Sequence, residues 1–306
     1  MLRTFAEIRG KVRALGAARR VAIPAADDET SIEAAVDARR EGIAGSILIG
    51  AGARIAALLR GRGADPAAFE IVDLPDPEKA AALAVRLAKE GKADLILKGR
   101  LDTAILLKAA LDRTAGLRTG RLLSDITIFE DPLWDGRGGR LVGITDGGIT
   151  PAPTLAQKRQ ILENAVEVFQ RLGCAVPKVA VMSATEKVSD KIASTVDARA
   201  LVDLCRRGEI TGCVVEGPLA LDVATLRWCA ERKGIESAIA GEVDIMLMPT
   251  FEAGNMVAKA LVFYMRRQIG HVIMGAQAPI LINSRTDDAA LKLNSIALSI
   301  LAGLKP

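Results

Sequence analysis

Aromatic residues and histidine are scarce in this chain of 306 residues. Phe, Trp and Tyr together make up 3% of the chain, so Ala, Val, Leu and Ile must fill its interior. The single histidine, His271, stands directly before an apolar segment, where we expect a structural role. There is no Ser-His-Asp arrangement, no H-E-x-x-H motif and no Cys/His cluster. Histidine-based hydrolysis and a zinc site are therefore disfavoured.

The phosphate-binding signatures of the common nucleotide folds are also missing. The chain has no G-x-x-x-x-G-K-[ST] motif, and no G-x-G-x-x-G follows the first predicted strand. A metal or hydride mechanism is therefore disfavoured. No stripe of basic residues interleaved with aromatics is present, so we expect no nucleic-acid partner. The net charge of +4 suits a protein that handles small anions, and solubility explains it equally well.

Cysteine and long apolar runs are limited too. None of the four cysteines (Cys174, Cys205, Cys213, Cys229) belongs to a C-x-x-C pair, and we expect buried free thiols, which persist in a reducing compartment. The first 20 residues carry charges throughout, unlike a secretory signal. No apolar run approaches the roughly 18 to 20 residues that span a membrane. A cytoplasmic protein with no membrane partner is expected.

Apolar segments of strand length alternate with capped, amphipathic segments of helix length along most of the chain. This alternation predicts an α/β fold with largely parallel strands covered on both faces. The length and the 50% hydrophobic content suggest two α/β/α sandwich domains with a cleft between them. We expect residues 1–148 plus 272–306 to form the first domain and residues 149–271 the second. The Gly/Pro-rich segment "DGGITPAP" would then mark the crossing between them.

Two polar segments follow predicted strands. "LILKGRLDT" ends a buried strand with Lys98 and Gly99, where a cation suits phosphate and glycine allows a backbone to approach a ligand. Solvated charges at a strand end explain the same pattern. "FEAGNMVAK" places Gly254 and Asn255 before a predicted helix, with Lys259 one turn in. A helix N-terminus suits an anion, and an Asn cap with a surface lysine is the alternative.

Three further segments have the same character. "TDGG" (145–148) and "EGPLALD" (216–222) are consistent with a turn at a domain boundary and with a strand end followed by a cap. "LINSRTDD" (281–288) follows an apolar run with a hydroxyl, a guanidinium and two carboxylates, and a helical segment comes next. Such corners are where α/β enzymes often carry their chemistry. Together the corners suit transfer between an anionic leaving group and a nucleophile.

Six segments in order resemble the phosphate acetyl/butyryltransferase family. They are "LKGRLDT…LLKAAL", "ITDGGITPAP", "PKVAVMSATEKVSDK", "VVEGPLALDVA", "VDIMLMPTFEAGNMVAKAL" and "MGAQAPILINSRTD". The resemblance implies the reaction acyl-CoA + phosphate ⇌ acyl phosphate + CoA. It also implies two domains of the isocitrate/isopropylmalate dehydrogenase type and a homodimer. Coenzyme A would be a substrate, with no bound cofactor and no metal.

The resemblance also assigns site residues. The catalytic pair of the family corresponds to Ser284 and Arg285, with Asp287 as a base or as the residue that orients it. CoA attacks as its thiolate, so its thiol must lose a proton. Ser284 would hold the sulfur, and Arg285 would bind phosphate and the developing oxyanion. The expected substrate-binding residues are Lys98, Gly99, Thr103, Lys108, Asp146, Gly254, Asn255 and Lys259.

Two positions depart from the acetyl branch of the family. That branch has its base Asp seven residues after the serine, where this chain has Leu291, and its Arg after the "G…T" motif appears here as Lys108. Asp287 and Asp288 follow Ser284 by three and four residues, as in the butyryl branch. Three rival functions stay open: a related acyltransferase that uses acyl carrier protein, an NAD- and metal-dependent dehydrogenase of the same fold, and a non-catalytic acyl-CoA or phosphate sensor. The sequence does not set the acyl chain length.

Overall fold

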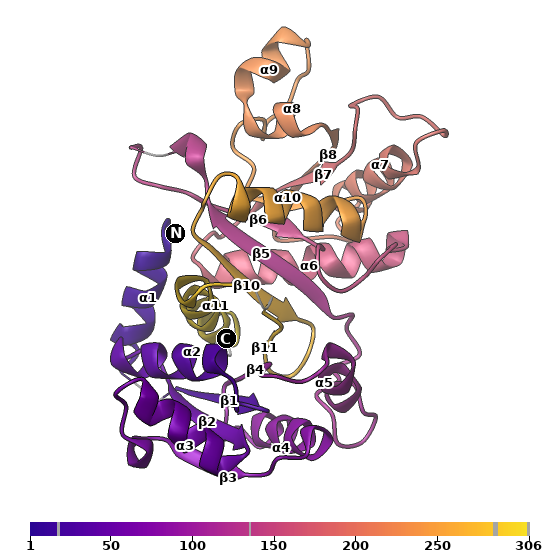
Figure 1. Ribbon diagram of the computed structural model, residues 1–306. Helices are drawn as coiled ribbons and strands as arrows, with labels where there is room; N and C mark the ends of the chain where they lie inside the picture. Colours follow the sequence, from indigo (N-terminus) through magenta and orange to yellow (C-terminus); the bar gives the residue numbers. More distant parts are fainter. Residues whose placement is uncertain (17–18, 135, 284–286, 305–306) are drawn as a thin grey trace. The chain divides into compact units, whose positions relative to one another are not determined.

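The chain divides into two compact units in a computed structural model, which describes residues 1–16, 19–134, 136–283 and 287–304 (Figure 1). Unit 1 comprises Met1–Thr4 and Leu122–Arg267, and unit 2 comprises Phe5–Arg121 and Gln268–Pro306. The chain therefore passes between the units near residues 4, 121 and 267. The Gly/Pro-rich segment that was expected at the crossing lies within unit 1, because it joins two elements that pack together there, β6 and α6.

Unit 2 is built on strands in the order β3-β2-β1-β4-β11-β10. The strands run parallel from β3 to β11, and β10 is antiparallel to β11. The central strand β1 pairs on both sides, with Val21 opposite Ser46 of β2 and Leu95 of β4. The strands are β1 (Arg20–Pro24), β2 (Gly45–Gly50), β3 (Glu70–Asp73), β4 (Leu95–Leu97), β10 (Ile269–Met274) and β11 (Ile280–Leu281).

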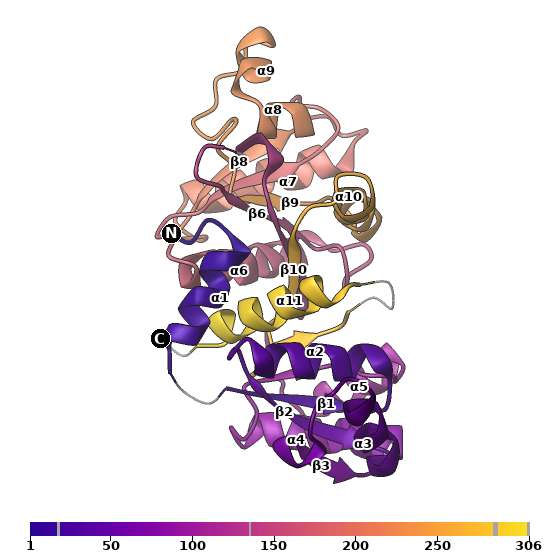
Figure 2. The same ribbon diagram turned by 60° about the vertical axis from the view of Figure 1, so that its left-hand side comes forward.

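The helices that connect the parallel strands of this sheet cover both of its faces. Right-handed crossovers place α2 and α3 on one face and α4 on the other. Accordingly, α2 packs against α3 and α11, α11 packs against α1, and α4 packs against α5 (Figures 1 and 2). The helices are α1 (Phe5–Ala14), α2 (Glu29–Arg40), α3 (Gly52–Gly61), α4 (Pro77–Lys89), α5 (Thr103–Ala110) and α11 (Ala289–Ala302), with a short 3-10 turn at Pro66–Ala68.

Unit 1 has strands in the order β5-β6-β9-β7-β8. β5 is antiparallel to β6, and the other neighbours are parallel. Its strands are β5 (Ser124–Glu130), β6 (Leu141–Thr145), β7 (Lys178–Met182), β8 (Val214–Leu219) and β9 (Ile245–Leu247). Its helices are α6 (Leu155–Arg171), α7 (Ala193–Arg206), α8 (Leu221–Thr225), α9 (Arg227–Arg232) and α10 (Phe251–Phe263), with a 3-10 turn at Pro132–Trp134.

Side-chain caps explain where several helices begin. The Asp28 carboxylate accepts the amides of Thr30 and Ser31 at the start of α2. At α4, Asp76 caps the helix and Pro77 fills its first turn, where a backbone N–H has no helical partner. Thr154 and Gln157 form a reciprocal capping box at α6. These polar residues therefore set the helix starts, and the apolar faces behind them supply the core.

No helix in the described part of the chain is long and apolar enough to cross a membrane. The four cysteines are free, as expected, although only Cys229 is fully buried. Burial raises the pKa of the Cys174 thiol to about 11 and that of Cys213 to about 12. Because the thiolate is the reactive form, both thiols are held in their unreactive state.

Candidate functional site

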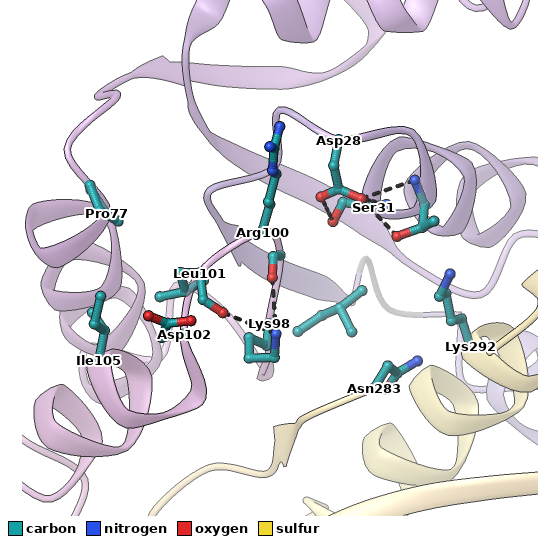
Figure 3. Close-up of a pocket in the computed structure, with 13 residues that line it drawn as sticks. Asp28, Ser31, Pro77, Lys98, Arg100, Leu101, Asp102, Ile105, Asn283 and Lys292 are labelled. Carbon is teal, nitrogen blue, oxygen red and sulfur yellow. Dashed lines mark hydrogen bonds between the residues drawn. The ribbon is translucent and has the colours of Figure 1, made fainter. Parts of the chain in front are cut away.

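A pocket of about 580 Å³ opens in unit 2 where the chain changes direction across the sheet. From β1 the chain moves outward to β2, whereas β4 lies on the other side of β1. Ligands of α/β sheets bind at such a switch point, beside the carboxyl ends of the strands. The pocket is lined by Asp28, Thr30, Ser31, Pro77, Leu97, Lys98, Gly99, Arg100, Leu101, Asp102, Ile105, Asn283 and Lys292 (Figure 3).

The loop after β4 is held to both neighbouring strands. The amides of Gly99 and Arg100 donate to the carbonyls of Pro24 and Ala25, at 3.1 and 2.8 Å. On the other side, the Lys98 amide donates to the Leu281 carbonyl at 2.9 Å. These bonds continue the sheet pairing beyond β4 and fix the loop that forms the pocket wall.

Close packing against the backbone at the end of β1 leaves no room for a side chain at Gly99. A Cβ atom there would lie 2.4 Å from the Ala25 carbonyl oxygen and 2.5 Å from that of Pro24. We predicted that Gly99 would allow a ligand to approach the backbone closely. In the structure, it is the backbone at the end of β1 that approaches Gly99. Gly99 still lines the pocket, so its backbone remains available to a bound molecule.

Cations line this pocket. The Lys98 ammonium donates to the carbonyls of Gly99 and Leu101, at 3.3 and 3.1 Å, which ties its charge to the loop (Figure 3). Arg100 is exposed at the mouth. Both oxygens of Asp28 are occupied, since they accept from the backbone and hydroxyls of Thr30 and Ser31 at 2.5 to 3.0 Å. The pocket therefore suits an anionic group.

Asn283 and Lys292 are among the lining residues that were not predicted as site residues from the sequence. Asn283 follows β11, and both polar atoms of its side chain are buried without a hydrogen-bond partner in the described residues. Lys292 lies in the first turn of α11 and is only 4% exposed. Burial lowers the pKa of Lys292, against the opposing effect of the carboxylates of Asp287, Glu33, Asp28 and Asp288. From the sequence alone, a lysine in an apolar helix is expected at the surface. Only the burial of Lys292 in the structure marks it as a candidate site residue.

The predicted catalytic pair, Ser284 and Arg285, lies outside the described residues. The residues on either side in the sequence are described. Asn283 lines the pocket, and Asp288 caps α11 by accepting the Leu291 amide at 2.8 Å. Asp287 is half-buried next to this cap.

Thr103 and Lys108 lie on α5, which begins at the pocket. Thr103 is its first residue and is exposed beside the lining residue Asp102. Lys108 lies in the last turn of α5 and lines a second cavity, of about 230 Å³, between α4 and α5. Ile105 lines both cavities, so they adjoin each other.

In unit 1 the structure brings two predicted segments together, "TDGG" and "FEAGNM". A Cβ on Gly147 would lie 2.8 Å from the Gly254 carbonyl carbon, and one on Gly254 would lie 2.6 Å from the Asp146 carbonyl oxygen. The Asn255 side chain donates to the Gly147 carbonyl at 3.1 Å. Both glycines therefore permit a crossing of two backbones, and Asn255 fastens it.

The Asp146 carboxylate organises the turn at this crossing. It is 3% exposed and accepts the amides of Gly148, Ile149 and Thr150, at 2.8, 2.9 and 3.1 Å. Burial, and then the nearby charge of Asp125, raise the pKa of Asp146 to about 6 in spite of these three donors.

The expected position of Gly254 and Asn255 ahead of a helix is wrong. α10 begins at Phe251, because the Thr250 hydroxyl accepts the Ala253 amide and caps the helix there. Gly254 and Asn255 therefore lie inside the first turns, and Asn255 is not the cap. Lys259 lies further along α10, exposed, with its ammonium 6.0 Å from the centre of the Phe263 ring.

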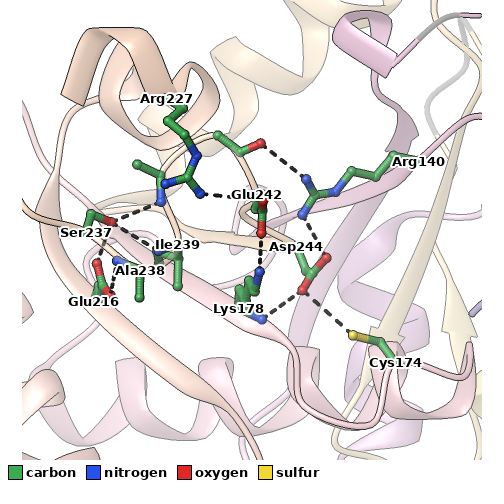
Figure 4. A network of polar contacts seen from close by, with 12 residues as sticks. Arg140, Cys174, Lys178, Glu216, Arg227, Ser237, Ala238, Ile239, Glu242 and Asp244 are labelled. Atoms are coloured by element: carbon green, nitrogen blue, oxygen red, sulfur yellow. Dashed lines mark hydrogen bonds and ion pairs between the residues drawn. The ribbon is translucent and has the colours of Figure 1, made fainter. Parts of the chain in front are cut away.

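A second polar cluster in unit 1 has a structural role. Asp244 accepts from the Arg140 guanidinium at 3.0 Å and from the Lys178 amide at 2.8 Å, while Lys178 and Arg227 pair with Glu242 (Figure 4). Arg140, Lys178 and Asp244 stand at the amino ends of β6, β7 and β9. Because α/β sheets bind ligands at the opposite edge, this network joins strands rather than forming a substrate site.

Among the described residues, no three His, Cys, Asp or Glu side chains gather as potential metal ligands. The pocket presents ammonium, guanidinium and amide groups, beside the carboxylates of Asp28 and Asp102. The cationic and amide groups bind and orient anions and stabilise developing negative charge.

Comparison with known proteins identifies a family and several relatives. The family model "Phosphate acetyl/butaryl transferase" matches residues 76–300. A phosphate butyryltransferase of Clostridium acetobutylicum is 40% identical, with 98% of each chain covered. Among solved structures, a branched-chain phosphotransacylase from Enterococcus faecalis is 28% identical with a TM-score of 0.80, over 93% of this chain and 99% of that one.

The likeness of fold extends further. A 4-hydroxythreonine-4-phosphate dehydrogenase from Klebsiella pneumoniae has a TM-score of 0.60 at 13% identity, over 94% of this chain and 100% of that one. The expected α/β fold of the dehydrogenase type is thereby confirmed. With the family match over residues 76–300 and the 40% identical relative, the conclusion is that the chain belongs to the phosphate acetyl/butyryltransferase family.

Proposed function

We propose that this protein moves a short acyl group, from acetyl to butyryl, between coenzyme A and inorganic phosphate. Family membership across most of the chain carries the proposal, and a cation-lined pocket at the switch point of unit 2 supports it. The relative with 98% coverage is a phosphate butyryltransferase, which favours a four-carbon acyl group. We place the reaction in the cytoplasm, where free cysteines persist.

The reaction is a single displacement at a carbonyl carbon. A phosphate oxygen attacks the thioester carbonyl, the C–S bond breaks, and CoA leaves as a thiolate that takes up a proton. In reverse, the thiolate attacks the acyl phosphate and phosphate leaves. Negative charge develops on the carbonyl oxygen in both directions, so aligned cationic donors accelerate both.

The predicted roles at the corner after β11 form part of this proposal. Arg285 binds phosphate and the developing oxyanion, Ser284 holds the sulfur, and Asp287 takes the thiol proton or orients the group that does. Asp287 stands directly before the cap of α11, which supports its placement near the pocket. Lys98 supplies a second fixed cation, and Gly99 offers its backbone.

The remaining predicted substrate-binding residues fall into two groups. Thr103 and Lys108 lie on α5, near the pocket and its neighbouring cavity, and we keep them as substrate-binding candidates. Asp146, Gly254 and Asn255 form the backbone crossing of unit 1, and the contacts there support a positioning role. Lys259 is kept as a candidate for the anionic end of CoA, since its ammonium is exposed.

The test is release of free CoA thiol from acetyl-, propionyl-, butyryl- and longer acyl-CoA. Release should require phosphate, or arsenate in its place, and should persist in EDTA. Butyryl-CoA should be the best of the series. Equal release in phosphate-free buffer would indicate a hydrolase and overturn the proposal.

We also propose that the protein acts as a homodimer. α10 and the turn that follows it leave four large apolar side chains exposed within ten residues: Met256 (65%), Phe263 (55%), Tyr264 (89%) and Met265 (50%). Apolar surface of this kind commonly marks a protein interface. Light scattering should give the mass of two 32.3 kDa chains, and Phe263→Glu with Tyr264→Glu should yield monomers. A monomer of wild-type protein at micromolar concentration would contradict this.

A further inference from the structure

Lys292 is a buried lysine that lines the pocket. It is 4% exposed, and every residue of α11 from Leu291 to Ala302 is buried with it. Its ammonium makes no hydrogen bond or ion pair with any residue that the structure describes, whereas its backbone amide donates to the Asp288 carbonyl at 3.2 Å. A buried ammonium is costly unless an anion or several acceptors compensate it, so the site calls for an anion.

The carboxylates around Lys292 are already engaged. Asp28 accepts four hydrogen bonds, and Asp288 accepts the Leu291 amide. Glu33 pairs with Arg62 at 3.0 Å. A molecule that enters the pocket can therefore supply the direct anionic contact for the Lys292 ammonium.

The side chain of Asn283 also lacks hydrogen-bond partners among the described residues. Its amide nitrogen and oxygen are both buried. Figure 3 places Asn283 and Lys292 on the same side of the pocket, with Asp102 and Ile105 on the other side and Lys98 between them. Buried polar atoms are nearly always bonded, so these two residues mark one subsite.

The side-chain amide of Asn283 limits which anions can bind at this subsite. Its NH2 group needs an acceptor, and its oxygen needs a donor. Hydrogen phosphate, HPO4²⁻, offers acceptor oxygens to the ammonium and to the amide NH2, and its single O–H can donate to the amide oxygen. Sulfate has the same shape and charge but no hydrogen to donate.

We propose that Lys292 and Asn283 bind inorganic phosphate as a substrate, with Lys292 compensating its charge and Asn283 recognising its remaining hydrogen. This assignment rests on the proposed transfer to phosphate and names the residues that hold it. It adds to the predicted corner of Ser284 and Arg285 a neutral donor–acceptor pair that selects phosphate over sulfate.

Lys292→Met is the first test, made in the full chain. Methionine matches the length of the buried stem without charge, so the melting temperature should not fall. The KM for phosphate should rise about tenfold or more, as expected for loss of a charged hydrogen bond, while the KM for butyryl-CoA stays within about twofold. Lys292→Gln serves as a second variant should Lys292→Met not fold. Lys11→Met, which removes an exposed lysine of α1 in the same unit, should leave both values unchanged.

A binding measurement without turnover separates this proposal from the reaction itself. Phosphate alone should raise the melting temperature of the wild type more than sulfate does, and Lys292→Met should lose this stabilisation. Asn283→Ala should reduce the preference for phosphate over sulfate. If phosphate stabilises the wild type as described but no phosphate-dependent CoA release occurs, the subsite stands and the proposed function fails.

Three results would overturn the assignment. One is an unchanged KM for phosphate in Lys292→Met. Another is equal stabilisation of the wild type by sulfate and phosphate. The third is a fall in kcat with a displaced pH–rate profile and no change in the KM for phosphate, which would make Lys292 a base rather than a phosphate ligand.

Discussion

The Gly99 amide donates to the Pro24 carbonyl oxygen at 3.1 Å, and a methyl group on Gly99 would lie 2.5 Å from the same oxygen. This contact joins the loops that follow β1 and β4, the two strands between which the pocket opens. The shape of the pocket wall thus depends on the absence of one Cβ atom.

Gly99→Ala should therefore damage both the fold and the site. The clash is with backbone carbonyls, which cannot turn aside, so we expect a loss of about 1 to 3 kcal/mol in the free energy of unfolding. Urea denaturation measures this loss, and the KM for phosphate should rise because Lys98 moves with the loop. Gly10→Ala, inside α1 with no atom within 4 Å of the new Cβ, should instead stabilise by up to ~1 kcal/mol. Unchanged stability in Gly99→Ala would show that the loop can relax freely.

Asp146 should make stability depend on pH. Its native pKa of about 6 lies above the ordinary value of 3.8, so the native state binds more protons between these values. The resulting stabilisation is fully present below about pH 4 and is lost as the pH rises through 6. Relative to Asp146→Asn, the free energy of unfolding of the wild type should fall by roughly 2 to 3 kcal/mol between about pH 4 and pH 7. If the free energy of unfolding of the two proteins changed with pH in the same way, Asp146 would not cause the pH dependence.

Arg285→Lys tests the corner that resemblance assigns to catalysis. If Arg285 binds phosphate and the developing oxyanion, a lysine at this position will not support the reaction, because one ammonium cannot offer two parallel N–H donors. We expect a loss of ~3 to 4 kcal/mol of transition-state stabilisation, a hundred- to a thousand-fold fall in kcat, with little change in melting temperature. Near-normal turnover on the same preparation that is used for melting would exclude Arg285 from the active site.

The helix starts were the most predictable feature, where a cap precedes an amphipathic segment. Asp28 before α2 and Asp76 before α4 have local signals that the structure bears out. The predicted start of α10 was wrong because a glycine such as Gly254 often lies outside a helix. Here the glycine lies inside α10 and allows a close contact with Gly147, which is more than a hundred residues away. Contacts of that kind leave no local pattern.

The site was predictable only in part, for the same reason. Lys98 and Gly99 stand at a strand end, and that position alone indicated the pocket. Asn283 stands in the segment "LINSRTDD" but was not assigned a role, and Lys292 belongs to no motif, since both are distinguished by burial. The boundaries of the units, near residues 4, 121 and 267, likewise depend on which elements pack together.

The most direct test of acyl transfer is the stoichiometry of its two products. Phosphorus NMR of wild-type protein with butyryl-CoA and phosphate should show acyl phosphate appearing as inorganic phosphate declines. One acyl phosphate should form for each CoA thiol released, and Arg285→Lys should slow both signals equally. Thiol release without an acyl phosphate resonance, at any phosphate concentration, would contradict the account.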